Sequence, residues 1–92
     1  MESSLSHASH DAVAKRLKRA NGHLQNVITM LSEERACLDV AQQLHAVERA
    51  IAAAKKLLIH DHIDHCLDHA VGASAASTRQ VLGEFKAITK YL

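Results

Sequence analysis

The fold is decided by residues 37–69, which read CLDVAQQLHAVERAIAAAKKLLIHDHIDHCLDH. This stretch contains no proline or glycine, and Ala, Leu, Gln, Glu, Lys and Arg, which are strong helix formers, dominate it. Its larger aliphatic residues recur at intervals of three, four and seven, as expected for an apolar stripe on one helix face. They are Leu44, Val47, Ile51 and Leu58. We therefore predict one long helix over about residues 35–70.

A thiol lies near each end of this expected helix, Cys37 in the first turn and Cys66 near the last. His62 precedes Cys66 by four positions, so the two side chains share one face at a spacing that suits two ligands of one metal ion. Cys37 lies 25 positions before His62, a rise of roughly 37 Å along a helix. One straight helix therefore cannot bring the three residues together, whereas an antiparallel copy can. If they form one site, that site is shared between two chains, and symmetry gives two sites per dimer.

Histidines are dense in residues 60–69, HDHIDHCLDH. His69 shares the helix face of His62 and Cys66, and His65 flanks that face. The aspartates between them can orient the imidazoles as hydrogen-bond acceptors. The alternative is a polar, partly exposed helix end, where histidine is favourable. The segment lacks a second close pair of ligands, so it is not a zinc-finger pattern.

The rest of the chain also predicts helices joined by short connections. With 92 residues the chain is expected to be one all-α domain, 1–92, and its core must be aliphatic because it has one Phe, one Tyr and no Trp. Residues 1–8 are expected to form a flexible polar arm, followed by a helix over about 9–31 with Ser9 as its N-cap. This helix carries a heptad-like stripe of Val13, Leu17, Ala20, Leu24, Val27 or Ile28, and Leu31. Such stripes favour a helical oligomer over a compact monomer.

The C-terminal part predicts a third helix. Gly72 is a suitable residue to end the long helix. Ser77-Thr78-Arg79-Gln80 resembles a capping box, so the third helix is expected over about 77–92. We expect this helix to lie across a dimer or to join dimers together.

Basic residues crowd two turns of the first helix and recur on the long helix. The cluster consists of Lys15, Arg16, Lys18 and Arg19, and it is extended by Arg49, Lys55 and Lys56. One interpretation is a solvated helix face, and the other is a patch that contacts phosphates. No aromatic residue interleaves these charges, so stacking on single-stranded bases is disfavoured and contact with a duplex backbone is the natural form.

Composition bounds the function further. The formal charge of +1 neither requires nor excludes a nucleic-acid partner. The first dozen residues have no apolar signal-peptide core, and no apolar run approaches the length of a membrane span, so we expect a cytoplasmic protein without membrane contact. There is no phosphate loop, nucleophile elbow or His-Glu-x-x-His motif, so we do not expect an enzyme. In a cytosolic chain, two cysteines are more often metal-binding, redox-active or simply buried than bridged.

These residues resemble the CsoR/RcnR family of bacterial metal-sensing repressors over about residues 13–70. The basic first helix leads into Ala20-Asn21-Gly22-His23, which is similar to a Gln-Gly-Gln-like segment of that family. Residues 37–44, CLDVAQQL, are similar to the family's Cys-x-x-Val-x-x-Gln-Ile. The most specific likeness is Cys37, then His62 after 25 positions and Cys66 after 29.

The resemblance implies a disc-like tetramer of two antiparallel dimers, with no helix-turn-helix. It implies that the metal-free tetramer holds double-stranded operator DNA through basic residues and releases it when inducer binds. In copper sensors of the family, a Cys-His-Cys set binds Cu(I) across the dimer interface, so Cys37, His62 and Cys66 are the expected ligands. Two thiolates and one imidazole form a soft site suited to Cu(I).

Departures from the family pattern leave alternatives open. His7 and His10 supply N-terminal donors, and His65 and His69 enrich the site, as a Ni(II) or Co(II) sensor would require. Glu48 stands where many members carry a basic residue. Persulfide sensors of the family lack the central histidine, so His62 argues against that type. A metal carrier without a DNA partner and a thiol-based sensor of electrophiles are further alternatives.

Overall fold

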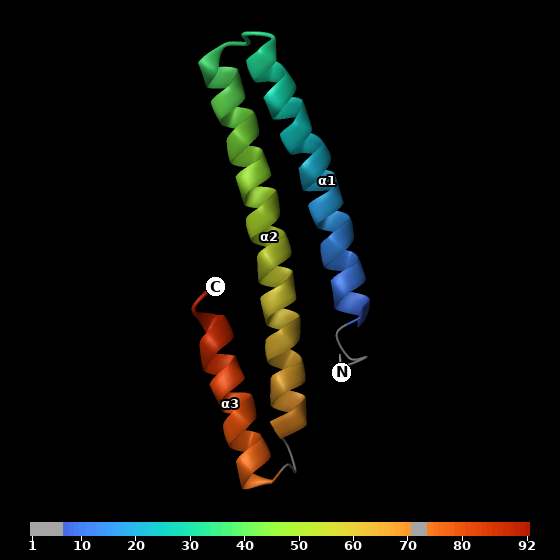
Figure 1. Ribbon diagram of the computed structural model, residues 1–92, viewed down its shortest axis with the longest axis vertical. Helices are drawn as coiled ribbons and strands as arrows, with labels where there is room; N and C mark the ends of the chain where they lie inside the picture. The colour runs from blue at the N-terminus through green and yellow to red at the C-terminus, as the bar shows by residue number, and fades with distance from the viewer. Residues whose placement is uncertain (1–6, 71–73) are drawn as a thin grey trace.

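The protein is described by a computed structural model that covers residues 7–70 and 74–92. It consists of α1 (His7–Ser32), α2 (Cys37–Ala70) and α3 (Ala75–Thr89), and none of the described residues forms a strand. Figure 1 shows α1 and α2 as a long antiparallel hairpin, with α3 returning beside the C-terminal half of α2. α2 contacts both other helices, whereas α1 and α3 do not touch. The prediction of an all-α chain of three helices is confirmed.

The helix boundaries differ from the expected ones by at most three residues. α1 begins at His7 instead of Ser9, so Ser9 lies inside the first turn and is not the N-cap. Of the arm expected over residues 1–8, residues 1–6 lie outside the described part. α2 is a single helix of 34 residues that begins at Cys37, as the absence of proline and glycine predicts. No helix in the described part of the chain has the length and apolarity needed to cross a membrane.

The hairpin is held by a narrow aliphatic seam between α1 and α2. The buried apolar residues of the described chain are Val13, Ala20, Val27, Met30, Val40, Val47, Ala54 and Ile59. Several repeat every seven positions, which keeps them on the sides of the two helices that face each other. Val27, Met30, Val40 and Val47 pack together, with Leu24 against them. Most of the buried residues are valines and alanines, so the core inside one chain is thin.

A second apolar seam stays uncovered within one chain. Leu44 and Ile51 of the stripe predicted for α2 are 48% and 44% exposed, and only Val47 of that stripe is buried. On α1, Leu17, Ile28 and Leu31 are likewise exposed. Val13, Ala20 and Val27 of the α1 stripe are buried, so each stripe packs only in part inside the hairpin, because α1 and α2 meet along the line of smaller residues. The larger side chains are left facing outward.

The turn between α1 and α2 is closed by a defined set of hydrogen bonds. The Arg35 N–H donates to the Met30 carbonyl at 3.0 Å, and the Glu34 N–H donates to the Leu31 carbonyl at 3.2 Å. These two bonds form a Schellman motif, with Glu34 at the C′ position and a φ of 56°. The motif ends α1 and reverses the chain within four residues, 33–36.

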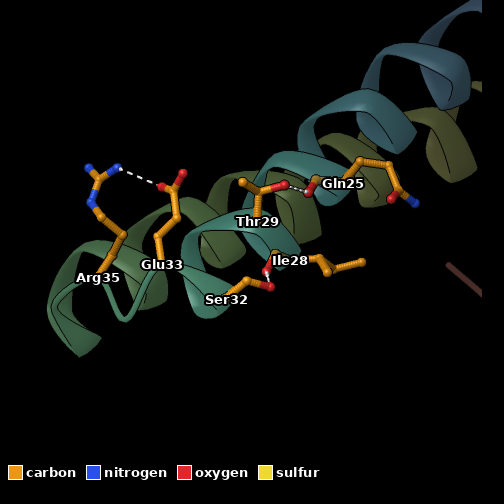
Figure 2. A network of polar contacts seen from close by, with 6 residues as sticks. All are labelled: Gln25, Ile28, Thr29, Ser32, Glu33 and Arg35. Carbon is orange, nitrogen blue, oxygen red and sulfur yellow. Dashed lines mark hydrogen bonds and ion pairs between the residues drawn. The ribbon is translucent and has the colours of Figure 1, made fainter.

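Side chains add further contacts at this end of α1 (Figure 2). The Thr29 and Ser32 hydroxyls each donate to the carbonyl four positions earlier, at 3.2 Å. The guanidinium Nη1 of Arg35 lies 3.8 Å from Oε1 of Glu33, and both side chains are largely exposed, so this pair adds little stability. The turn is therefore held mainly by its backbone.

Glu34→Gly is expected to stabilise the protein. A non-glycine residue in the left-handed region costs roughly 1–2 kcal/mol, and the extra freedom of glycine in the unfolded chain offsets part of the gain. A carboxylate is also unfavourable at a helix C-terminus. We expect the free energy of unfolding to rise by about 1 kcal/mol, and the melting temperature by roughly 4 °C at fixed protein concentration.

Glu33→Gly is the matched control, because Glu33 does not have a positive φ. Among the described non-glycine residues, only Glu34 has one. This variant should lower the melting temperature, since glycine there gains no backbone relief. Equal melting temperatures for the two variants in thermal denaturation would show that the backbone of Glu34 carries no strain.

α3 begins earlier than its sequence suggests. Its N-cap is Ser74, whose hydroxyl oxygen accepts a hydrogen bond of 3.1 Å from the Ser77 N–H. The capping box expected at residues 77–80 was therefore placed one turn too late, and the helix ends at Thr89 instead of Leu92. Gly72, the expected end of the long helix, lies outside the described residues. None of the residues of α3 is fully buried, so α3 rests on α2 with an open outer face.

Candidate metal centre and nucleic-acid interface

Cys37 is the first residue of α2, next to the interhelix turn. Its thiol is free and exposed, so it is not the small buried apolar residue that the alternative interpretation required. Cysteine binds metals as the thiolate. Cys37 can therefore bind a soft metal or react with an electrophile.

The other expected ligands lie at the opposite end of α2. His62 is half-buried there, and Cys66 and His69 follow within the helix, although their side chains lie outside the described part of the structure. Since α2 is uninterrupted, the rise from Cys37 to His62 is roughly 37 Å. In the part of the chain that the structure describes, no three His, Cys, Asp or Glu side chains gather closely enough to hold a metal ion. Because of this rise, one chain cannot bring the three expected ligands together.

His65 occupies a sheltered position one turn after Asp61. Its Nδ1 lies 3.4 Å from Oδ2 of Asp61, as expected for a carboxylate that orients an imidazole. This nitrogen atom is buried beside the carboxylate, so the other ring nitrogen, Nε2, is the one left for a metal. His65 is close in sequence to His62 and Cys66 and fits a donor set for a soft or borderline metal. By contrast, His60 is exposed.

The N-terminal histidines lie at the same end of the hairpin as the histidine-rich segment. α1 is antiparallel to α2, so its first turn, with His7 and His10, lies alongside the C-terminal half of α2 (Figure 1). His10 is exposed, and the side chain of His7 lies outside the described part. The fold therefore places N-terminal donors near the end of α2 that carries His62.

Four basic residues surround a groove between α1 and α2. Arg16, Arg19 and His23 line an open hollow of about 210 Å³ together with Ala20, Ala50 and Ala53. A second hollow of about 250 Å³ shares Ala53 and is lined by Arg49, Ala52 and Lys56. We call these two hollows the basic groove. Its floor is made of alanines, and none of the described carboxylates lines it. It can accept an anionic chain close to the helix surface, as a phosphate backbone requires.

The other predicted basic residues do not line this groove. Lys15 is paired with Asp11, four positions earlier, at 3.2 Å on an exposed surface. Lys18 and Lys55 are exposed but line neither hollow. The structure thus brings together Arg16, Arg19, Arg49 and Lys56 out of the seven candidates.

Glu48 faces a different surface from its neighbour Arg49. It lines an open, mainly apolar hollow of about 570 Å³ with Leu24, Leu44 and Ile51. Its Oε1 lies 3.5 Å from Nδ1 of His45, which lines the same hollow. The acidic residue at position 48 therefore lies on the uncovered apolar seam and adds no carboxylate to the basic groove.

A polar bridge between α1 and α2 was not foreseen from the sequence. The Nε2 of His23 lies 2.7 Å from Oε1 of Gln43 and joins the two helices. One signal was available, since His23 follows Arg16 by seven positions and Arg19 by four, and so shares their helix face. The partner Gln43 could not be found from spacing, because it depends on the register of the hairpin.

The sequence model of the family described as "Metal-sensitive transcriptional repressor" matches residues 9–91, nearly the whole chain. The chain belongs to this family. Repressors of this family are not enzymes, so the prediction that the chain is not an enzyme is confirmed.

Characterised members of the repressor family resemble the chain at moderate identity. The copper-sensing repressor CsoR of Mycobacterium ulcerans is 40% identical over 60 residues, and the match spans 65% of this chain and only 51% of that protein. The copper-sensing repressor RicR of Mycobacterium tuberculosis is 32% identical over 77 residues, 84% of this chain and 80% of RicR. CsoR of Bacillus subtilis is 32% identical over 82 residues, 87% of this chain and 81% of that CsoR. No solved structure matches the chain significantly.

Proposed function

We propose that the chain is a copper-responsive repressor that holds operator DNA in its metal-free form and releases it when Cu(I) binds between two chains. Cys37 of one chain and His62 and Cys66 of a second chain are the proposed ligands. The observation that carries the proposal is the straight, uninterrupted α2, with a free exposed thiol at one end and the other two ligands roughly 37 Å away. Such a set can only be completed by a second, antiparallel helix.

The uncovered apolar seam supports a second copy of the chain as the partner. The hollow of about 570 Å³ around Leu44 and Ile51 is open in one chain, although its lining is largely apolar. Exposed apolar patches of this kind mark interaction surfaces. A two-fold axis across the seam would run the two α2 helices antiparallel, with the Cys37 end of each beside the His62 end of the other. α3 would then be free to join two such dimers into a tetramer.

The donor set supports Cu(I) over harder metals. Two thiolates and one imidazole are soft ligands, and soft ligands select Cu(I). His65 offers one further imidazole, whose Nδ1 lies 3.4 Å from Oδ2 of Asp61. The named relatives are copper sensors, which agrees with this choice.

The basic groove is the proposed DNA-binding surface. Its four cations, Arg16, Arg19, Arg49 and Lys56, come from both helices of the hairpin, so their spacing depends on how α1 and α2 are placed in the assembly. Joining the start of α2 to the end of the partner's α2 would bias the assembly toward a shape in which the grooves no longer match the duplex. Release requires the metal to bind this shape more tightly than the DNA-bound one.

A Ni(II) or Co(II) sensor is the second candidate, and one observation favours it. The fold places the first turn of α1, with His7 and His10, at the same end of the hairpin as His62 and His65. Deleting residues 1–10 separates the candidates. The nickel candidate predicts a large loss of metal affinity, whereas the copper candidate predicts almost none.

Metal titration of the reduced protein tests the proposed site. We expect one tightly bound Cu(I) per chain, with intense ultraviolet thiolate charge transfer and weak Ni(II) binding, before and after deletion of residues 1–10. Tight Ni(II) binding that is lost on deletion would transfer the function to the second candidate. If neither metal binds tightly, the metal-sensor function is wrong, and thiol chemistry at Cys37 takes its place.

A further inference from the structure

His23 is a titratable residue of the basic groove that the predicted basic patch does not include. It lines the same hollow as Arg16 and Arg19, and Ala50 and Ala53 of α2 form the opposite wall. It is half-buried, because its ring reaches across toward α2. A ligand that enters the groove therefore meets an imidazole beside two guanidinium groups.

The hydrogen bond to Gln43 defines which ring nitrogen of His23 is available. Its Nε2 lies 2.7 Å from Oε1 of Gln43, and an amide oxygen only accepts, so Nε2 must carry the hydrogen. In the neutral ring the remaining nitrogen, Nδ1, then holds a lone pair, which repels an anionic oxygen. In the imidazolium form Nδ1 carries a hydrogen and becomes a second donor. Gln43 can accept from Nε2 in both forms.

We propose that His23 is a phosphate-binding residue of the groove and that it acts as the imidazolium, so that DNA binding takes up one proton from solvent. The ligand is a phosphodiester of the duplex backbone, held jointly by His23, Arg16 and Arg19 over the alanine wall. This inference rests on the proposed DNA-binding function. It goes beyond that function because it makes DNA affinity dependent on pH through one named side chain.

Cationic and uncharged groups surround His23 on the two helices that form the hollow. From α1 it is faced by the cations Arg16 and Arg19, and from α2 by the uncharged Gln43, Ala50 and Ala53. No carboxylate lines this hollow, and α3 does not touch α1. An anionic phosphate that enters the hollow therefore meets cations and an imidazole. Histidine is the side chain whose charge changes between about pH 5 and 8, so the effect falls in an accessible range.

The test compares DNA affinity and its salt dependence at about pH 6 and about pH 8. The probe is a fluorescein-labelled duplex from the promoter of the chain's own gene, titrated with metal-free, reduced protein and followed by anisotropy. Lowering the pH should steepen the slope of log affinity against log salt concentration in the unsubstituted chain. The steepening should exceed that of His23→Gln by about 0.9. Glutamine keeps an amide donor for Gln43 and cannot gain charge. His23→Lys should keep the steep slope at both pH values.

His45→Gln is the matched control, because His45 lies on the apolar seam and outside the basic groove. The DNA affinity of this variant and its salt dependence should change with pH as those of the unsubstituted chain do. Identical pH dependence in His23→Gln and the unsubstituted chain would overturn the proposal for His23 while leaving DNA binding intact. If the unsubstituted chain does not bind the duplex, the proposed function itself fails. Competition by inorganic phosphate as strong as by unlabelled duplex would show that the groove is a site for free phosphate instead.

Discussion

Cys37→Ala is expected to keep DNA binding and to abolish its loss on addition of Cu(I). The variant loses one of two thiolates from the proposed site, while the basic groove stays intact because Cys37 is exposed at the far end of α2. Metal-dependent changes in DNA affinity are typically about 5- to 150-fold, and the variant should show none of this change. Anisotropy titration of the promoter duplex with and without Cu(I) measures the effect.

His60→Ala is the control for this experiment, since it removes an exposed imidazole from α2 two positions before the proposed ligand His62. It should respond to Cu(I) as the unsubstituted chain does. Normal metal-driven release by Cys37→Ala would show that this thiol is not a ligand.

Mixing two inactive variants gives a test of whether the site is shared. Neither Cys37→Ala nor His62→Ala should bind Cu(I) tightly alone. After joint unfolding and refolding in equal amounts, half of the dimers carry both variants, and each mixed dimer has one intact site out of two. The mixture should therefore recover about a quarter of the normal Cu(I) capacity. Zero recovery, with mixed dimers verified by mass spectrometry, would place the ligands within one chain.

The second large effect is expected from replacing both arginines on the α1 side of the basic groove. Arg16→Ala combined with Arg19→Ala removes two of the four cations that line the groove, and both side chains are exposed, so folding should be unaffected. Loss of two phosphate contacts should flatten the slope of log affinity against log salt concentration by about 1.8. The DNA affinity of the double variant should therefore be lower than that of the unsubstituted chain, most of all at low salt. Salt-dependent anisotropy on the promoter duplex measures both quantities.

Lys15→Ala combined with Lys18→Ala is the matched control, with the same change in charge on the same two turns of α1. Lys15 is already paired with Asp11, and neither lysine lines the groove, so the slope should change much less. Equal effects of the two double variants would mean that the whole helix face contacts DNA without a defined groove.

Much of the fold followed from the sequence because it depends on local signals. The absence of proline and glycine from residues 37–69 predicted an unbroken helix, and the structure has one from Cys37 to Ala70. The predicted helix boundaries were wrong where more than one residue can cap the helix. Ser74 and Ser77 can both cap a helix, and the choice of Ser74 depends on how the chain leaves α2.

The spacing of Cys37 and His62 also predicted that a single chain cannot complete the metal site, because a helix has a fixed rise per residue. What could not be predicted was the line along which α1 and α2 meet. The spacing did not show which apolar residues of α2 face α1, and in the structure these are Val40, Val47 and Ala54. The basic groove depends on the same register, which brings Ala50 and Ala53 opposite Arg16 and Arg19.

The thin seam between α1 and α2 also bears on the lifetime of the chain in a cell. A hairpin whose buried residues are mostly valine and alanine, with Leu44 and Ile51 left in water, gains little free energy from folding alone. Its folded population should then increase with its own concentration. Newly made or diluted chains would be open to proteases until they meet a partner, so degradation would remove unassembled copies and keep the cellular level close to that of complete assemblies.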